Sequence, residues 1–503
     1  MKSKKNQVPN NNEQEKNIKN KNLENNKPND KKNPKNMVNS KEEEEKIELL
    51  NYFEKIPHDY TLYLLDLLYK TKGINFKLFE KNIKTIKQKI NSIIKNKDDK
   101  DNEDLYIILS TIYGAFLADS MGSFCEFTEF NKKNHEMIFK VTNDTIFQPG
   151  QVTDDSEMAM SLAYSIMDNP NYKSLNQNLM FFYYVIWYYS DPLDSGVTTQ
   201  TALSTIDQKE LENKLDITSN NIFSSYIKKY INKSNKDSLA NGLLMRLSPL
   251  LTWFYMMNKS YINETLEIDP NDKTISGKFY NLYQKIFVEV EKDGQLTHPN
   301  RENAVAGSIL IFIGLCAMSR KFSGREILNL VQILFEDNHF NPKGEENKLR
   351  NYYINLIQYL KDPSFNESIY FGNLSDQMGY YFHAFKFTIY NLYVFDDFKG
   401  NNVYNQIIYK ICDYGGDTDT NAAIVGMIIG PLIGLENFDK HKLDIFLNFY
   451  SKTRLIYTNV LMYFYAKYLV DISENPTSHT KNSKFKFNVG ELLYDMTNKE
   501  IDL

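Results

Sequence analysis

Apolar residues along this 503-residue chain recur mainly at intervals of three and four, which is the period of an amphipathic helix. In one stretch, Leu105, Ile108 and Ile112 fall on a single face and predict a helix over residues 104–119. Strict alternation of apolar and polar residues is scarce, so we expect only one short strand, at residues 139–141. The pattern therefore predicts an all-α fold.

The helical pattern covers most of the chain. Further helices are predicted near residues 47–94, 158–166, 243–253, 304–318, 327–335, 352–360, 380–394, 407–413, 420–435 and 443–469. We assign residues 46–98 to a helical extension, residues 99–472 to one helical domain and residues 473–503 to a polar C-terminal tail. Gly426, Gly430 and Gly434, each four residues apart on one face, predict a close approach by another helix.

The first part of the chain has a different composition. Residues 1–45 are dominated by Asn, Lys and Glu and contain few apolar side chains. Such a segment cannot bury enough apolar surface to offset the entropy lost on folding. We therefore predict a disordered tail, with a basic targeting segment as the alternative.

Charge and composition exclude several classes of function. The formal net charge is −5 and the basic residues are spread along the chain, so no direct nucleic-acid binding is expected. No secretory segment and no charge-free apolar stretch of about 20 residues is visible, so no membrane attachment is expected. A cytoplasmic or nuclear location is favoured over a mitochondrial one, because the first forty residues contain several acids and no arginine. We expect a monomer.

The three cysteines give no sign of a disulfide framework. Cys125, Cys316 and Cys412 are widely spaced and form no CxxC pair, which favours free thiols. Cys125 lies beside a motif described below and could act as a nucleophile. No histidine partner for it can be named from the sequence, so this role is disfavoured.

Two acidic clusters lie far apart in the chain and both precede a predicted helix. Together they offer four carboxylates and two threonine hydroxyls, a set of oxygen ligands that hard divalent cations such as Mg²⁺ and Mn²⁺ prefer. Their residues are Thr153, Asp154, Asp155, Asp417, Asp419 and Thr420. Each cluster could also serve only as a helix cap. A calcium loop of the EF-hand type is excluded, because Ala422 and Ile428 occupy the positions that require glycine and an acid.

A third motif, residues 114–127, places Asp119 and Glu126 around the end of a predicted helix. For Asp119 we favour a buried hydrogen-bonding support over a role as ligand. Glu126 stands between Phe124 and Phe127, so its pKa could be raised enough for general acid or base catalysis.

Six segments resemble the motifs of the ADP-ribosylglycohydrolase family, which includes the dinitrogenase reductase-activating glycohydrolases. They follow the order of the family and together cover about residues 105–440; the run Gly-Gly-Asp-Thr-Asp-Thr-Asn-Ala-Ala is the most specific. The segments are residues 114–127, 153–159, 194–199, 241–246, 297–299 and 415–423.

The resemblance implies a compact, orthogonal bundle of helices with two Mg²⁺ or Mn²⁺ ions as cofactors. It implies that the ions are held by the residues matching Thr153, Asp154, Asp155, Asp417, Asp419 and Thr420. It also implies catalytic roles for Glu126, Asp155 and Asp194, and substrate contacts by Asp194, Gly196, Asn241, Gly242 and His298.

Two of these assignments have structural alternatives, and one departure from the family affects the substrate. Asp194 could instead belong to a turn between Pro192 and Gly196. His298 could be a packing residue before a helix start. Leu243 and Leu244 replace the smaller residues that are common in the family, and we expect them to narrow the phosphate-binding cleft.

The resemblance implies a metal-dependent hydrolase that cleaves the glycosidic bond between ADP-ribose and an acceptor. The partner would be an ADP-ribosylated protein or a small ADP-ribose conjugate. Residues 122–126 resemble the serine-directed branch more than the arginine-directed one. The alternatives are a non-catalytic ADP-ribose-binding module and a structural relative of the family. The complete acidic set disfavours both.

Overall fold

The computed structural model describes residues 74–126, 132–141, 146–169, 171–204, 234–267, 274–338, 340, 344–400, 402–474, 489–501 and 503. The tail predicted over residues 1–45 and the first part of the helical extension lie outside these residues.

Eighteen α-helices and no β-strand are found within the described residues, which confirms the predicted all-α class. The helices are α3 (Phe76–Lys95), α4 (Lys100–Gly122), α5 (Asp154–Met167), α6 (Gln177–Tyr189), α7 (Val197–Leu203), α10 (Ser248–Met257), α11 (Lys259–Thr265), α12 (Ile275–Gly294), α13 (Arg301–Met318), α14 (Gly324–Phe335), α15 (Glu345–Lys361), α16 (Glu367–Phe371), α17 (Tyr381–Val394), α18 (Val403–Tyr414), α19 (Thr418–Ile433), α20 (Lys440–Asn448), α21 (Met462–Glu474) and α22 (Val489–Asn498). Short 3₁₀ turns include η1 (Lys132–Met137) and η2 (Asn241–Leu243).

Three local predictions differ from the structure. The helix predicted near residues 443–469 is divided into α20 and α21 by residues 449–461, which form loops and short 3₁₀ turns. The strand expected at residues 139–141 is wrong: Phe139 has a φ of 69° and belongs to a turn. The C-terminal segment expected to be a polar tail contains α22, whose Val489 and Leu493 are buried. This helix packs against α3. The apolar spacing of four residues was present in the sequence but was outweighed by the polar residues around it.

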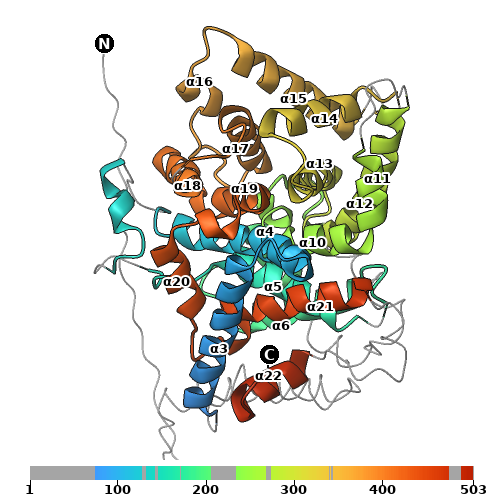
Figure 1. The fold of residues 1–503 in the computed structure, drawn as a ribbon. Helices are drawn as coiled ribbons and strands as arrows, with labels where there is room; N and C mark the ends of the chain where they lie inside the picture. Colours follow the sequence, from blue (N-terminus) through green and yellow to red (C-terminus); the bar gives the residue numbers. More distant parts are fainter. Residues whose placement is uncertain are drawn as a thin grey trace, which may run out of the picture. The chain divides into compact units, whose positions relative to one another are not determined.

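At the centre of the helical domain, α4 and α19 lie side by side (Figure 1). Both are apolar almost all round, as expected of helices surrounded by others. A methyl group on Gly114 would lie 2.5 Å from the Gly426 carbonyl oxygen and 2.8 Å from the Gly430 Cα. The two backbones therefore touch, and the predicted close approach is confirmed for Gly426 and Gly430. Gly434, the third glycine of the predicted row, instead ends α19 as its C-cap residue.

The two helices run antiparallel, so the end of α4 meets the start of α19. The Thr418 hydroxyl donates to the Gly122 carbonyl oxygen at 2.8 Å. A methyl group on Gly122 would lie 2.5 Å from the Thr418 carbonyl oxygen. This contact brings the residues that follow α4 to the acidic cluster at the start of α19.

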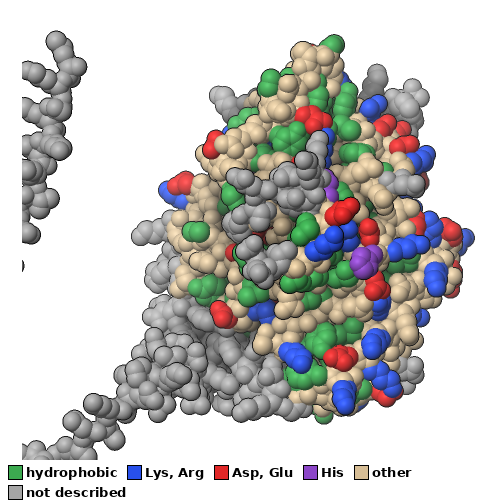
Figure 2. Space-filling model, turned by 90° about the vertical axis from the view of Figure 1, so that its left-hand side faces the viewer, with side chains coloured by type: hydrophobic (Ala, Val, Ile, Leu, Met, Phe, Trp, Pro, Cys, Tyr) green, Lys and Arg blue, Asp and Glu red, His purple; other side chains and the backbone are tan. Residues whose placement is uncertain are grey.

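Two helices, α4 and α13, have the length and hydropathy of a membrane span, but 94% of each apolar window is buried inside the protein. Core helices of globular domains have the same property. On the face shown in Figure 2, basic, acidic and apolar side chains are interspersed.

We predict that Gly114→Ala destabilises the protein by about 1–3 kcal/mol, because its methyl group would push the two central helices apart. Gly277→Ala is the matched control: it also lies in a helix, α12, but its methyl group would meet only the Asp337 carboxylate, at 3.7 Å. The free energy of unfolding of this control should rise by up to about 1 kcal/mol, because alanine favours a helix more than glycine does. Urea unfolding measures both, and equal stability of the two variants would contradict the proposed contact.

Candidate functional site

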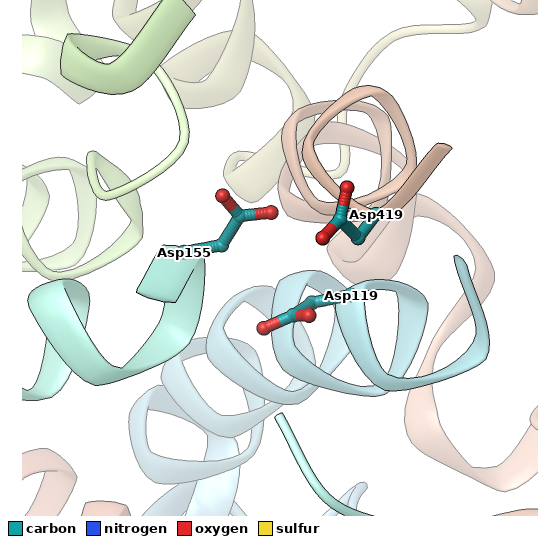
Figure 3. A group of neighbouring side chains, drawn as sticks. All are labelled: Asp119, Asp155 and Asp419. Atoms are coloured by element: carbon teal, nitrogen blue, oxygen red, sulfur yellow. The ribbon is translucent and has the colours of Figure 1, made fainter. Parts of the chain in front are cut away.

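The N-terminal turns of α5 and α19 meet beside the end of α4, and this brings the two acidic clusters together. Thr153 caps α5, and Asp417 occupies the N-cap position of α19. The Thr420 hydroxyl donates to Asp155 Oδ1 at 2.9 Å, across a sequence separation of 265 residues. In Figure 3, the carboxylates of Asp155 and Asp419 face one another, with Asp119 beneath them on α4.

Asp119 holds the first cluster in place. Its two carboxylate oxygens accept hydrogen bonds from the backbone N–H groups of Thr153 and Ser156, at 3.2 Å, and from both of their hydroxyls. Burial raises the pKa of Asp119 to about 7, although these donors favour the charged form. The geometry agrees with the supporting role favoured from the sequence.

Carboxylate oxygens gather in two groups that share Asp419. One oxygen each from Asp119, Asp155 and Asp419 lie within 4.8 Å of one another, and the same holds for Glu126, Asp194 and Asp419. Asp119 is already bonded to four donors. Asp155 and Asp419 are therefore better placed than Asp119 to bind a cation.

The electrostatics of the centre fit a divalent cation. Burial raises the pKa of Asp155 and Asp419 well above the ordinary value, and the neighbouring carboxylates, including Asp417, raise it further. Asp155 Oδ2 and Glu126 Oε2 are buried without a hydrogen-bond partner. Oxygens of this kind are ligands for hard cations, which would also neutralise the crowded negative charge. The donor set therefore fits the metal centre predicted from the sequence.

Glu126 follows directly from α4 and reaches the same centre. Burial, with added repulsion from Asp417 and Asp194, raises its pKa to about 8. Its side chain therefore holds a proton at neutral pH when no cation is bound. The neighbouring Cys125 is buried and its pKa is raised by burial, which keeps it a thiol. A nucleophilic role for Cys125 is therefore not supported.

The loop before α7 lies against the first cluster. The Gly196 N–H donates to Asp154 Oδ2 at 3.2 Å, and Gly196 is the N-cap residue of α7. Asp194 Oδ1 accepts from the Ser195 N–H at 2.7 Å, as in a turn, and one oxygen of the same carboxyl lies within 4.8 Å of oxygens of Glu126 and Asp419. The turn and site interpretations of Asp194 are thus compatible.

Asn241 links a further segment to the second cluster. Its amide Nδ2 donates to Asp417 Oδ2 at 2.7 Å, and its backbone N–H donates to the Gly379 carbonyl oxygen at 2.8 Å. A methyl group on Gly242 would lie 2.6 Å from the ring of His298, so only glycine fits there. The predicted substrate residues Asn241 and Gly242 therefore share one wall, in contact with both Asp417 and His298.

His298 is buried and held by a hydrogen bond between its Nδ1 and the Thr297 hydroxyl, at 2.8 Å. Burial, assisted by the charge of Arg246, lowers its pKa well below the ordinary value, so the ring is neutral. The cap of α13 is Asn300, so His298 precedes the helix start. Arg246 is itself buried in an ion pair with Asp293.

The expectation that Leu243 and Leu244 narrow the phosphate-binding cleft is wrong. Both side chains are fully buried. They point into the core, where Leu243 lies beside Gly294 and Leu244 beside Gly307. Their size is accommodated by these small residues of α12 and α13.

His383 of α17 was not among the candidates predicted from the sequence. It is buried, its Nδ1 has no hydrogen-bond partner, and Asp417 is among the charges that influence its pKa. Burial is the largest effect and lowers that pKa. No motif marks His383, because its proximity to Asp417 arises only from the folding of α17 against α19.

Comparison with known proteins identifies the family of the chain. The family model described as ADP-ribosylglycohydrolase matches residues 101–455, which is more than half of the chain. The chain belongs to the ADP-ribosylglycohydrolase family. This confirms the resemblance inferred from the six sequence segments and supports a glycohydrolase function in general terms.

One relative agrees with the family assignment. A protein of Acanthamoeba polyphaga mimivirus named "Putative ADP-ribosyl glycohydrolase L543" is 28% identical over 334 residues, which cover 64% of this chain and 86% of the viral protein. The chain is also similar to a solved structure titled "ADP-ribosylglycohydrolase-related protein complex", which is 17% identical and covers 74% of this chain and 99% of its own, with a TM-score of 0.44.

Stability of the cation-free protein should depend on pH. Unfolded carboxyl groups lose their protons near pH 4, whereas folded Asp119 and Glu126 keep theirs to about pH 7 and about pH 8. The folded state thus binds more protons between these values, so stability falls as pH rises from about 4 to about 8. We predict that the Tm of EDTA-treated protein falls over this range and that added Mg²⁺ reverses the fall.

Differential scanning fluorimetry with and without Mg²⁺ at several pH values tests this expectation. At a hundredfold excess over Kd, cation binding should add about 2.7 kcal/mol. Asp155→Asn should lose most of the Mg²⁺-induced rise in Tm. Asp444→Asn should retain it, because Asp444 lies on α20, where its carboxylate is paired with Lys87 of α3. An identical Mg²⁺-induced rise in Tm at low and high pH would contradict a cation site at these carboxylates.

Proposed function

We propose that this protein is a metal-dependent hydrolase that cleaves the glycosidic bond between C1″ of ADP-ribose and an acceptor, using two Mg²⁺ or Mn²⁺ ions. The observation that carries the proposal is the meeting of the two acidic clusters through Thr420 and Asp155, within a chain of the ADP-ribosylglycohydrolase family. The acceptor would be a protein side chain or a small conjugate.

We predict that six residues hold the cations. They are Thr153, Asp154, Asp155, Asp417, Asp419 and Thr420. Cations bound at their oxygens would stabilise developing negative charge and give the ribose hydroxyls fixed partners. The buried oxygens without hydrogen-bond partners, on Asp155 and Glu126, support this arrangement.

Glu126 is the best candidate for proton transfer. Cleavage at an anomeric carbon passes through an oxocarbenium-like transition state, in which water adds as the acceptor leaves. Glu126 Oε2 has no hydrogen-bond partner, and its pKa of about 8 allows it to hold or release a proton near neutral pH. It would take a proton from the attacking water or give one to the leaving acceptor.

Neighbouring residues would orient the substrate. Asp194 approaches Glu126 and Asp419, and Asn241 is fixed by its bond to Asp417. His298 packs against Gly242, and its ring is uncharged. We expect the ribose to lie between the two acidic clusters and the wall formed by Asn241 and Gly242.

The first test is the release of ADP-ribose from serine-linked and arginine-linked ADP-ribosyl peptides, with Mg²⁺ and with EDTA. We predict metal-dependent release from one of the two peptides and none from Asp417→Ala. Release of ADP-ribose by a metal-free preparation would refute the metal-dependent mechanism. Retained ADP-ribose binding without any release would instead favour a non-catalytic binding module.

Glu126→Gln tests the proton-transfer role. It preserves the size of the side chain but removes the exchangeable acid, so kcat should fall by about 10²–10⁴-fold with little change in KM. Glu336→Gln is the matched control, since it makes the same chemical change at an exposed position at the end of α14. Steady-state kinetics of Glu126→Gln within a few-fold of the wild type would exclude Glu126 as the acid or base.

A further inference from the structure

A cavity outside the acidic centre is lined by residues that adjoin this centre along the chain. Its volume is about 870 Å³, within the range of binding pockets. We call it the acceptor cleft. Three loops form its walls, and the lining residues are Ile146, Gln148, Gln151, Ser190, Asp191, Leu193, Phe449, Tyr450, Ser451, Lys452, Thr453 and Arg454.

Two walls of the acceptor cleft lead directly into the catalytic centre. Gln151 stands two residues before Thr153, and Leu193 immediately precedes Asp194. A group bound against these residues would therefore lie next to the carboxylates of the site. At most one residue separates the lining of the cleft from a residue of the centre in these two loops, so no helix lies between them.

The third wall is tied to the helix that carries the first acidic cluster. Arg454 Nε donates to Glu157 Oε1 at 2.7 Å, in the first turn of α5, and Arg454 Nη1 donates to the Ser190 carbonyl oxygen at 2.7 Å. Trp187 also donates to Glu157, at 2.9 Å. One buried ion pair therefore fixes the cleft relative to α5.

The chemistry of the cleft does not suit a diphosphate. Of its two basic residues, Arg454 is paired with Glu157, whereas Lys452 is exposed and lies over the ring of Phe76 at 5.3 Å. Asp191 also lines the cleft and opposes the charge of Lys452. A diphosphate favours several cationic partners, and the cleft offers only one that is not already paired with an acid.

The cleft does suit a polypeptide. Ile146 and Leu193 are 71% and 64% exposed and both line the cleft, so they offer neighbouring contacts to apolar side chains of a partner. Gln148, Gln151 and Ser190 add polar groups that can bond to peptide amides. Apolar contacts combined with a few hydrogen-bonding groups are characteristic of protein interfaces.

We propose that the acceptor cleft receives the polypeptide of an ADP-ribosylated protein, on the acceptor side of the scissile bond. This inference rests on the proposed function and adds a partner to it. The ADP-ribose unit occupies the acidic centre, and the chain to which it is attached runs over Ile146 and Leu193.

One wall of the cleft depends on a helix outside the family-matched residues 101–455. Phe79 of α3 packs edge-to-face on Tyr450, with ring centroids 5.7 Å apart. The Tyr450 hydroxyl donates to Glu80 Oε1 at 2.5 Å. The helix α3 thus positions the wall around Tyr450, and this part of the cleft belongs to the extension of this chain rather than to the matched region.

The test compares two substrates that share one linkage: an ADP-ribosyl peptide cleaved by the wild type, and the corresponding ADP-ribosylated free amino acid. Ile146→Glu should raise KM for the peptide roughly tenfold, about 1.4 kcal/mol of lost binding. It should leave kcat and KM for the amino-acid conjugate unchanged. Ile369→Glu is the control, because Ile369 of α16 is equally exposed, at 71%, and lies outside the cleft.

Each other outcome has a distinct meaning. An equal rise in KM for both substrates would place the ADP-ribose unit in the cleft and overturn the inference. Unchanged kinetics of Ile146→Glu with both substrates would also overturn it while leaving the proposed function intact. A wild type that cleaves neither substrate in the presence of Mg²⁺ would refute the proposed function itself, and this inference with it.

Discussion

The direct contact between the backbones of α4 and α19 is the constraint on which the site depends. At Gly114, Gly426 and Gly430 no side chain separates the two helices, and a single methyl group would force them apart. Because the helices run antiparallel, this contact also fixes the end of α4 at Gly122 against the start of α19. The distance between Glu126, which follows α4, and Asp419, in the first turn of α19, is set by this packing.

The same packing concentrates carboxylates in a buried place. Burial of several carboxylates within a few ångströms is unfavourable unless protons, hydrogen bonds or cations compensate. Asp119 is compensated by four donors from the start of α5. Asp155 and Glu126 each keep an oxygen without a hydrogen-bond partner, and a proton or a cation bound there would supply the compensating charge. The stability of such a centre depends on the protons or cations that it binds.

Much of the fold could be predicted from the sequence, because helices with one apolar face produce a regular spacing. The helix α6 was missed because its sequence is apolar nearly throughout and lacks contrast between faces. The helix α12 was missed although Phe279, Ile286 and Val290 mark a buried face at helical spacing. In α22 the apolar positions were also present, but a polar surrounding segment suggested a tail.

The sequence by itself determined the helical class, the chemical nature of the acidic clusters and their positions at helix starts, since spacing and residue type are local properties. Only the tertiary structure decided that Thr420 meets Asp155. It also decided that Leu243 points into the core and that His383 lies close enough to Asp417 for the charge of Asp417 to affect its pKa. The acceptor cleft belongs to this second group, because its walls come from loops about 300 residues apart and its outer support comes from α3. Contacts between distant segments depend on which helix faces pack together, and the spacing of apolar residues within one helix does not specify its partner.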